Sequence, residues 1–390
     1  MWPPRSTPRA DDAAECSRSI RVGDARARLE EIRGRIGVTR LGDTTSLDVL
    51  GICTAVAIRR DVVEPGITVA SGKGRTVADA RLTALAESYE RYCAEPRGRI
   101  PTFRGGYSDL RTAIDPRSLV PAWWSRYSPE QSLEWCIGVA LDDGHECAVP
   151  ANAVFFPYEP PPLEQLFSSH TTGLSCGGAM EDALCSGLLE CIERDHYTRV
   201  VAQLSSGCAV DSFEIDVATL PPSDASEVKR LRATGTSVVL RDITGDFGIP
   251  TVLALIARDS QVHRGCAAHP RSNVAARAAL FEAAQGRATD IQGAREDLLP
   301  FDGVAPHRWF TEPLAVGGLR NSVLVVDDIG AEVRFLARRM KEVLGEAPVA
   351  VDLSLDGAGV PAIRIVAPGL EFWAEDEDRI GPRCRAWMDG

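Results

Sequence analysis

Three predicted helices, far apart in the chain, each carry two carboxylate or carboxamide side chains three positions apart. The helices cover residues 84–91, 187–194 and 279–287, and the pairs are Glu87 and Glu90, Glu190 and Glu193, and Glu282 and Gln285. Residues three apart project from the same helix face, about 5–6 Å apart at Cβ. Two carboxylates at that distance repel each other, so each glutamate pair favours a cation between its members. The irregular intervals between the helices exclude a solenoid of regular repeats.

Paired carboxylates favour a particular kind of ion. Hard cations such as Mg²⁺ take oxygen ligands and often bridge to the phosphates of a nucleotide. A purely structural helix more often places glutamate opposite lysine. The pattern therefore indicates a site for Mg²⁺ and a nucleotide. Three solvent-facing amphipathic helices remain the alternative, since Glu and Arg are common helix formers.

Glycine-rich stretches precede the first two of these helices, at residues 71–76 and 171–178. Such stretches let backbone N–H groups approach phosphate oxygens closely, and the helix N-terminus that follows favours negative charge. We therefore expect both to be loops that border the nucleotide. The first lacks the spacing of a P-loop, but it contains Lys73, one of only three lysines in the chain, which is a candidate for phosphate contact.

The remaining pattern predicts a mixed α/β chain. A helix is expected over residues 24–36, with Leu29, Ile32 and Ile36 on one face. Strands are expected at residues 53–59, 237–241, 251–257, 322–326, 347–353 and 363–366. The Pro-rich stretches 157–162 and 220–222 are too short for flexible interdomain linkers. We expect a disordered tail over residues 1–18, rich in Pro, Arg, Ser and Asp, and then one multi-lobed domain over residues 19–390.

The charge balance limits the partners of the protein. Lys and Arg number 43 against 55 Asp and Glu, which gives a net charge of −12, and such a surface repels phosphate backbones and anionic lipid. No stretch reaches the roughly 18 apolar residues of a membrane helix, and the first residues lack the apolar core of a signal peptide. We expect a cytoplasmic protein that binds neither nucleic acid nor a membrane.

The cysteines are expected to be reduced and mostly structural. Their number, 11, is odd, they are scattered, and no CxxC spacing occurs. Cys176, in the second glycine-rich stretch, is included in this expectation. His145-Glu146-Cys147 is the nearest approach to a metal cluster, but it follows Asp142-Asp143-Gly144, a sequence that favours a hairpin turn between two strands.

In their order along the chain, these segments resemble the YcaO family. The resemblance begins at residues 37–40 (Gly-Val-Thr-Arg), 45–48 (Thr-Ser-Leu-Asp) and Gly51, and it includes the first glycine-rich stretch and the first acidic helix. It continues through residues 149–151 (Val-Pro-Ala), the Thr-Gly-Leu stretch, residues 190–195 (Glu-Cys-Ile-Glu-Arg-Asp) and 268–270 (Ala-His-Pro). It ends with residues 282–287 and 293–297, so it covers about residues 37–298. No single segment is specific, whereas the ordered combination is highly specific.

The resemblance implies a YcaO-like fold with a nucleotide site built from the three acidic helices. Members of the family bind ATP and Mg²⁺ and phosphorylate a backbone amide oxygen of a peptide, which makes the amide carbon a good electrophile. By this resemblance Glu87, Glu90, Glu190 and Glu193 would bind the metal ion, and Glu190, Glu193 and Arg287 would be catalytic. The cofactor contacts would come from Lys73, Glu87, Glu90, Asp182, Glu282 and Gln285. Cations such as Lys73 and Arg287 would offset charge on the transferring phosphoryl group.

Four positions depart from the family pattern. Thr172 and Gly178 stand where asparagine is usual, Asp182 stands where glutamate is usual, and Ala278 stands where the third helix usually carries arginine. Arg277 is one residue earlier, which moves its side chain about 100° around the helix. Asp182 can still coordinate Mg²⁺ through a water molecule. These departures favour a second hypothesis, a non-catalytic, nucleotide-binding subunit that recruits a precursor peptide for an active partner.

Members of the family differ in the nucleophile that attacks the activated amide. A side-chain Cys, Ser or Thr gives an azoline, external sulfide gives a thioamide, and an amine gives an amidine. Azoline formers commonly end in a proline-rich tail and have a peptide-recruiting domain, whereas this chain ends in Arg-Cys-Arg-Ala-Trp-Met-Asp-Gly. Its stand-alone layout resembles the members that work with a TfuA-type partner in peptide thioamidation.

We therefore expect thioamide formation on a ribosomally made peptide or protein, with azoline or amidine formation second. A small-molecule kinase is a further alternative. The expected partners are the precursor peptide and a TfuA-type protein, and the resemblance is compatible with a homodimer.

If the acidic helices form a Mg²⁺–nucleotide site, Mg²⁺ and ATP together should raise the melting temperature. A ligand that binds only the folded chain stabilises it by mass action. Differential scanning fluorimetry with Mg-ATP, with ATP and EDTA, and with neither measures this shift. Equal melting temperatures at millimolar nucleotide would contradict the site.

Overall fold

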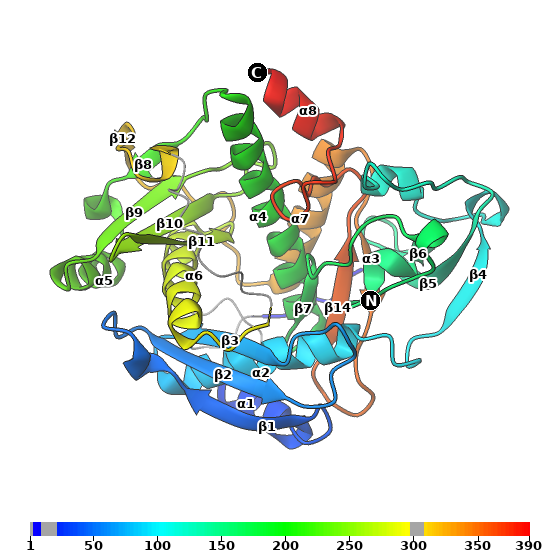
Figure 1. The fold of residues 1–390 in the computed structure, drawn as a ribbon, viewed down its shortest axis with the longest axis horizontal. Helices are drawn as coiled ribbons and strands as arrows, with labels where there is room; N and C mark the ends of the chain where they lie inside the picture. The colour runs from blue at the N-terminus through cyan, green and yellow to red at the C-terminus, as the bar shows by residue number, and fades with distance from the viewer. Residues whose placement is uncertain (1–2, 9–21, 297–307) are drawn as a thin grey trace.

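Three β-sheets and the helices that cover them make up the structure (Figure 1). The computed structural model describes residues 3–8, 22–296 and 308–390. The first sheet has the order β1-β2-β3, with β1 Val38–Asp43, β2 Cys53–Arg59 and β3 Val69–Gly74. The second has the order β11-β10-β9-β8-β12, with β8 Phe213–Ile215, β9 Ser237–Asp242, β10 Thr251–Arg258, β11 Gln261–Ala268 and β12 Val316–Gly317. The third has the order β4-β5-β13-β14-β7 with β6 paired to β5, and its strands are β4 Thr102–Gly106, β5 Ser132–Ala140, β6 Glu146–Pro150, β7 Leu174–Cys176, β13 Val349–Asp352 and β14 Ala362–Val366.

In each sheet, a strand at one end of the order leads directly into one of the acidic helices. β3 is followed by α2 (Val77–Ala94), β7 by α4 (Met180–Ser206) and β11 by α6 (Ser272–Gln292). Each helix packs against the sheet of the strand before it, α2 on β2 and β3, α4 on β7 and β14, and α6 on β10 and β11. Figure 1 shows the three helices arranged around the middle of the molecule. The expectation of a mixed α/β fold is confirmed.

The other helices complete the layers around these units. They are α1 (Val22–Ile32), α3 (Ala151–Val154), α5 (Pro222–Ala233), α7 (Ile329–Leu344) and α8 (Pro382–Asp389). α1 contacts α2, α5 contacts β9, and both α7 and α8 contact α4. α4 is thus covered on several sides, and its buried residues include polar ones such as Asp195 and His196. A long helix surrounded in this way can carry charged groups that solvent does not screen.

The prediction of a loop at the first glycine-rich stretch is wrong, because residues 71–74 belong to β3. A Cβ atom on Gly72 would lie well within 3.0 Å of Ala80 O and Ala84 N on α2. Gly265 on β11 lies equally close to α6, since a Cβ atom on Gly265 would meet Ala279 O and Ala283 N of that helix. These glycines let a helix lie directly on the last strand of its sheet, so close packing between strand and helix explains them.

Most of the other predicted elements are present. Residues 53–59 form β2, and the predictions at 237–241, 251–257, 347–353 and 363–366 correspond to β9, β10, β13 and β14 within a few residues. The first helix ends at Ile32, earlier than expected, although Leu29, Ile32 and Ile36 are all buried. The prediction of a strand at residues 322–326 is wrong, because this segment forms no strand. Its Val325 is 70% exposed, and Val323 N donates to Pro270 O at 2.9 Å in an isolated loop contact rather than in a strand ladder.

Part of the expected tail is bonded to the rest of the molecule. Arg5 N donates to Glu181 Oε1 at 2.8 Å, and Thr7 N donates to Asp328 Oδ1 at 2.8 Å. Residues 3–8 therefore lie against the N-terminal ends of α4 and α7, contrary to the prediction of disorder, and residues 9–18 lie outside the described part. Within the described residues, no helix combines the length and the apolar character needed to cross a membrane, and all cysteines are free.

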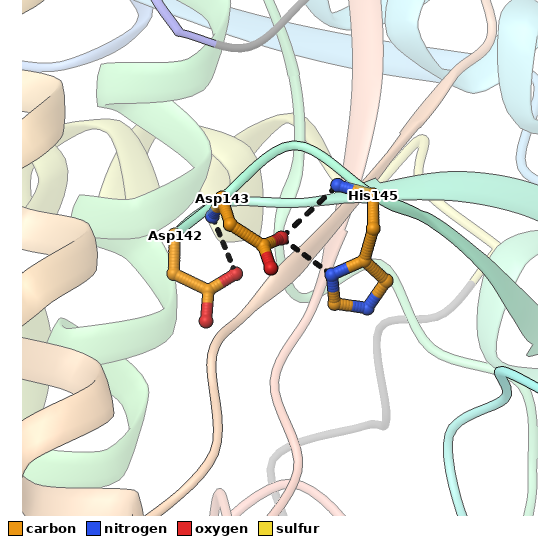
Figure 2. Close-up of side chains that lie close together, drawn as sticks. All are labelled: Asp142, Asp143 and His145. Atoms are coloured by element: carbon orange, nitrogen blue, oxygen red, sulfur yellow. Dashed lines mark hydrogen bonds and ion pairs between the residues drawn. The ribbon is translucent and has the colours of Figure 1, made fainter.

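The hairpin predicted at residues 142–144 joins β5 to β6. Figure 2 shows Asp142, Asp143 and His145 side by side on this turn. His145 Nδ1 lies 2.5 Å from Asp143 Oδ1, and Lys341 Nζ donates to Asp142 Oδ2 at 2.8 Å. Cys147 is buried on β6 and is not part of this group. The interactions are those of an exposed turn, as the hairpin interpretation predicts.

Substituting alanine for Gly72 tests the packing explanation. Gly72→Ala should lower the free energy of unfolding by about 1–3 kcal/mol, because the added methyl group forces α2 away from β3. Gly34→Ala is the matched control, since a Cβ atom there would have no neighbour within 4 Å. Urea denaturation of both variants measures the difference. Equal stabilities would refute the packing role of Gly72.

Candidate active site

The three acidic helices border one cavity of about 980 Å³, a size that suits a whole small-molecule ligand. The lining residues are drawn from all three strand–helix units, from the segment before β7 and from the chain beyond α6. Among the residues predicted from the sequence, those that line it are Lys73, Glu87, Glu90, Glu190, Glu193, Glu282 and Gln285. Their convergence favours the site over three unrelated, solvent-facing helices.

The first glutamates of α2 and α4 are held in the same way. Glu87 Oε2 accepts a hydrogen bond from Ser71 N at 3.1 Å, and Glu190 Oε2 accepts one from Gly173 N at 2.8 Å. An arginine four residues later binds the other oxygen in each case, Arg91 at 2.6 Å and Arg194 at 3.0 Å. These glutamates fix their helices to the preceding backbone and have limited freedom to move toward a ligand.

The second glutamates are held less firmly. Glu90 Oε1 accepts a hydrogen bond from Cys176 N on β7 at 2.8 Å, so this carboxylate joins the first strand–helix unit to the second. Glu193 makes no hydrogen bond or ion pair within the described part of the chain. It is half-buried and lines the cavity. An acidic group in this position is free to bind a ligand.

The third helix contributes a different pattern. Glu282 Oε2 accepts a hydrogen bond from Lys73 Nζ on β3 at 2.8 Å, which links the first and third units across the cavity. The two side chains are 27% and 41% exposed, so solvent screens this ion pair and its contribution to stability is small. The carboxamide of Gln285 has no partner among the described residues and faces the same cavity.

Burial and neighbouring charges favour the protonated forms of Glu90, Glu190 and Glu193. Burial raises the pKa of Glu90 to about 8, although the Cys176 backbone N–H opposes it. Burial also raises the pKa of Glu190. Burial, and then the nearby charge of Glu282, raises the pKa of Glu193 well above its ordinary value. The cavity therefore holds more negative groups than it can ionise without a cation.

Arg194 is the main cation among them. Burial disfavours its charged form, but Glu190, Glu375 and Glu193 outweigh this effect and raise its pKa. Its guanidinium also donates to Glu375 at 2.6 Å. One arginine does not balance the surrounding carboxylates, as the raised pKa values of Glu90 and Glu193 show.

The residues present fit Mg²⁺ and a nucleotide. Glu193 supplies a carboxylate without a partner in the described part of the chain, and Glu90 lies on the neighbouring helix of the same cavity. Oxygen ligands of this kind suit Mg²⁺, and a divalent ion would favour their ionised forms. Lys73, Arg194 and Arg264 also line the cavity, and cations there suit a polyphosphate.

Two predicted residues lie elsewhere. Arg287 Nε donates to Asp48 Oδ2 at 3.1 Å, and its side chain is only 7% exposed. Asp182 Oδ2 accepts a hydrogen bond from Ala179 N at 3.1 Å, at the N-terminus of α4. Neither is among the residues that line the cavity, and their contacts with phosphate or Mg²⁺ stay predictions.

The departures from the family pattern also have defined places. Thr172 is buried, and its hydroxyl has no hydrogen-bond partner in the described structure. Gly178 O accepts a hydrogen bond from Arg28 on α1 at 3.0 Å. Ala278 packs against the core of the second sheet. Arg277 Nη1 lies 3.6 Å from Asp224 Oδ1 on α5, so it does not replace the missing arginine in the cavity.

Sequence reasoning missed several residues of the cavity. The sequence did contain a pattern that predicts Arg91 and Arg194. Each follows a glutamate by four positions, a spacing at which the two side chains form an ion pair on a helix. Glu375 lies far from α4 in the sequence and had no such signal. The same holds for Arg264 on β11 and Arg295 after α6, which enter the lining through the fold.

Residues 71–371 match the family model of the YcaO cyclodehydratase, described as ATP- and Mg²⁺-binding. The chain belongs to the YcaO family. This is a family of ATP-dependent amide-activating enzymes. The family prediction is thereby confirmed, as are ATP and Mg²⁺ as the cofactors expected of it.

Two curated relatives support the assignment. An uncharacterised protein of Methanothermobacter thermautotrophicus is 34% identical over 370 residues, which cover 90% of this chain and 94% of that protein. An uncharacterised protein encoded in the tfuA 3′ region of Rhizobium leguminosarum bv. trifolii is 31% identical over 288 residues, which cover 68% of this chain and 65% of that protein.

Solved structures share the fold. The structure of YcaO from Methanopyrus kandleri, bound with AMPPCP and Mg²⁺, is 26% identical with a TM-score of 0.78, over 93% of this chain and 95% of that chain. A heterocyclase in complex with substrate and cofactor is 19% identical with a TM-score of 0.79, over 99% of this chain and 57% of that chain. The YcaO fold therefore extends over nearly the whole of this chain.

The raised pKa of Glu90 predicts how stability depends on pH. Its ordinary value is 4.5 and its value in the folded chain is about 8, so between these pH values the folded state retains a proton that the unfolded state has released. The free energy of unfolding of the ligand-free YcaO chain should therefore fall as the pH rises from about 4.5 to 8. Mg-ATP should restore more stability at pH 8 than at pH 6, because the ion binds the ionised carboxylate and displaces the proton.

Calorimetry of the wild type, Glu90→Gln and Glu31→Gln measures this. Glu90→Gln should flatten the decline, whereas Glu31→Gln, at an exposed position on α1, should leave it unchanged. A wild-type stability that rises over this range would contradict the assigned protonation of Glu90.

Proposed function

We propose that this YcaO protein phosphorylates a backbone amide of a ribosomally made peptide or protein and installs a thioamide together with a TfuA-type partner. The supporting observation is the Glu193 carboxylate, which has no partner among the residues that the structure describes and lies in a cavity bordered by all three acidic helices. That arrangement suits ATP and Mg²⁺ rather than a structural role. The amide-activating chemistry is that of the family.

Each group of residues has a separate task in this proposal. Glu90 and Glu193 hold Mg²⁺, while Glu87 and Glu190 keep α2 and α4 in place through the backbone N–H groups of Ser71 and Gly173. Mg²⁺, when bound, supplies positive charge that offsets the charge of the phosphates.

The cations that line the cavity would contact the phosphates of the nucleotide. Lys73, Arg194 and Arg264 orient the phosphates by charge and by their N–H donors. The fixed position of Lys73 beside Glu282 and of Arg194 beside Glu190 limits the reorganisation needed during transfer.

The proposed reaction has two steps, phosphorylation of the amide oxygen and replacement of the phosphate by sulfur. The amide oxygen of the peptide attacks the γ-phosphorus of ATP, the bond to the bridging oxygen breaks, and ADP leaves. Hydrosulfide then adds to the amide carbon, and phosphate leaves with the former amide oxygen. The product is a thioamide, formed without net oxidation or reduction.

The choice of sulfide rests on the relative encoded beside tfuA, which is 31% identical to this chain. Azoline formation is the second candidate, in which a side chain of the peptide replaces hydrosulfide as nucleophile. Mass spectrometry of a candidate peptide after incubation with the chain, Mg-ATP, sulfide and a TfuA-type protein separates them. Thioamidation replaces one oxygen by sulfur, whereas azoline formation removes one water. Exclusive loss of water would overturn the thioamide assignment.

The non-catalytic alternative is favoured by the absence of the family arginine at Ala278, because Arg277 pairs with Asp224 instead. It predicts nucleotide binding without turnover. Phosphate release by the chain with peptide and TfuA-type partner decides between the two.

The unequal surroundings of Glu190 and Glu193 predict a split between stability and activity. Glu193→Gln should leave the fold intact or slightly stabilise it, because it removes like-charge repulsion from Glu282, while peptide-dependent phosphate release falls about 10²-fold or more. Glu190→Gln should lower both turnover and stability, the latter by about 1–3 kcal/mol, since Arg194 loses a charged partner. Steady-state kinetics and urea denaturation on the same preparations measure the two effects.

The matched control is Glu31→Gln, which should change neither quantity by a measurable amount. A folded Glu193→Gln variant with wild-type turnover would remove Glu193 from the metal site. Equal losses of stability in both glutamine variants would show that the two glutamates are not held differently.

A further inference from the structure

A second, smaller pocket of about 200 Å³ lies beside α6, between the first and second sheets. Its walls come from the start of β2, the end of β3, the first turns of α5 and the middle of α6. Most of its lining is apolar, and includes Ile52, Leu220, Val228, Leu240, Leu280 and Phe281. Neither the nucleotide chemistry nor the core requires this opening.

One polar group in the pocket is buried without a full set of partners. The Asp224 side chain is 6% exposed, and its Oδ2 atom has no hydrogen-bond partner within residues 3–8, 22–296 and 308–390. Its Oδ1 atom lies 3.4 Å from Arg75 Nη2 and 3.6 Å from Arg277 Nη1. A buried acceptor without a donor is costly. Because this atom has almost no accessible surface, a ligand can satisfy it only if the Asp224 side chain turns toward the pocket.

The volume limits what the ligand can be. Whole small-molecule ligands occupy pockets of about 300–1,000 Å³, whereas a dry apolar cavity of about 150 Å³ accommodates a benzene ring. This pocket therefore has room for about one large apolar side chain. The carboxylate and the two guanidiniums beside it match the N–H and C=O groups of a peptide backbone.

From these features we propose that the pocket anchors one apolar side chain of the substrate peptide, with the Asp224 carboxylate turning to accept a backbone N–H of that peptide and with a backbone C=O toward Arg75 or Arg277. This inference rests on the proposed peptide-modifying function and names where the peptide is recognised. Because the apolar part of the lining is the larger part, we expect the anchor residue to be a leucine, phenylalanine or similar side chain.

The position of the pocket fits such a role. α6 places Glu282 and Gln285 in the ATP cavity and Arg277 and Phe281 in the pocket. Eight residues along a helix span about 12 Å, which an extended peptide covers with about four residues. A few residues of an extended peptide can therefore bridge the pocket and the cavity along α6.

A binding experiment with capped amino acids tests the pocket without any chemistry. The probes are N-acetyl-leucine N-methylamide and N-acetyl-serine N-methylamide, and binding to the full chain is measured by ligand-observed NMR. The leucine probe should bind at least ten-fold more tightly than the serine probe, because it buries more apolar surface.

A pair of tryptophan variants locates the binding. Ser223 is an exposed residue at the mouth of the pocket, while Ser226 is exposed on the same helix but does not line it. Ser223→Trp should weaken binding of the leucine probe at least ten-fold, and Ser226→Trp should not change it. Asp224→Asn, which keeps the shape of the side chain, should weaken binding several-fold.

The shift in melting temperature with Mg-ATP checks that each variant is folded and keeps the ATP site. With a modifiable peptide, Ser223→Trp should raise the KM for the peptide while kcat stays within two-fold. Equal binding of both probes, or equal binding to the Ser223→Trp and Ser226→Trp variants, would overturn the anchor pocket and leave the proposed chemistry untouched. Absence of peptide modification together with selective leucine binding would instead refute the chemistry.

Discussion

The convergence of carboxylates on one cavity is the constraint on which the rest of the site depends. Glu87 and Glu190 are compensated by a backbone N–H and an arginine each, and Glu282 by Lys73. Glu193 has no such compensation among the described residues, and its raised pKa reflects this. In the site that we propose, the fold stabilises the anchoring carboxylates, whereas the carboxylates assigned to the ion stay unfavourable until a cation binds. Binding of the ion then adds stability that the ligand-free chain lacks.

This arrangement requires the three helices to stay close to their sheets. Gly72 and Gly265 allow α2 and α6 to lie directly on β3 and β11, and the end strands of all three sheets then approach the same space. Contacts between units close the cavity, since Glu90 of the first unit binds Cys176 of the second, and Lys73 binds Glu282 of the third. The same helix α6 also borders the smaller pocket, so the proposed peptide anchor and the ATP cavity share one rigid element.

Much of the site was predictable from the sequence because helical spacing is a local property. Side chains three apart share a face, which was enough to select Glu87, Glu90, Glu190, Glu193, Glu282 and Gln285 and to infer Mg²⁺ and a nucleotide. The ordered motifs were enough to identify the YcaO family, which residues 71–371 confirm. Buried strands such as β2 and β10 were also recognisable, because continuous apolar runs between turn residues are typical of them.

The tertiary structure decided how these residues divide their tasks. Whether a glutamate anchors a helix or remains free depends on which backbone N–H lies next to it. Gly173 N donates to Glu190 and Cys176 N donates to Glu90, and the pairing of β7 with β14 in the third sheet positions both donors. Arg287 donates a hydrogen bond to Asp48, which is 239 residues earlier in the sequence. Gly72 and Gly265 allow close packing of a helix on a strand. For Gly72, the sequence alone does not distinguish this packing role from a place in a phosphate-binding loop. A sequence specifies which groups share a face, whereas the partners of a buried charge are set by segments that meet only in the folded chain.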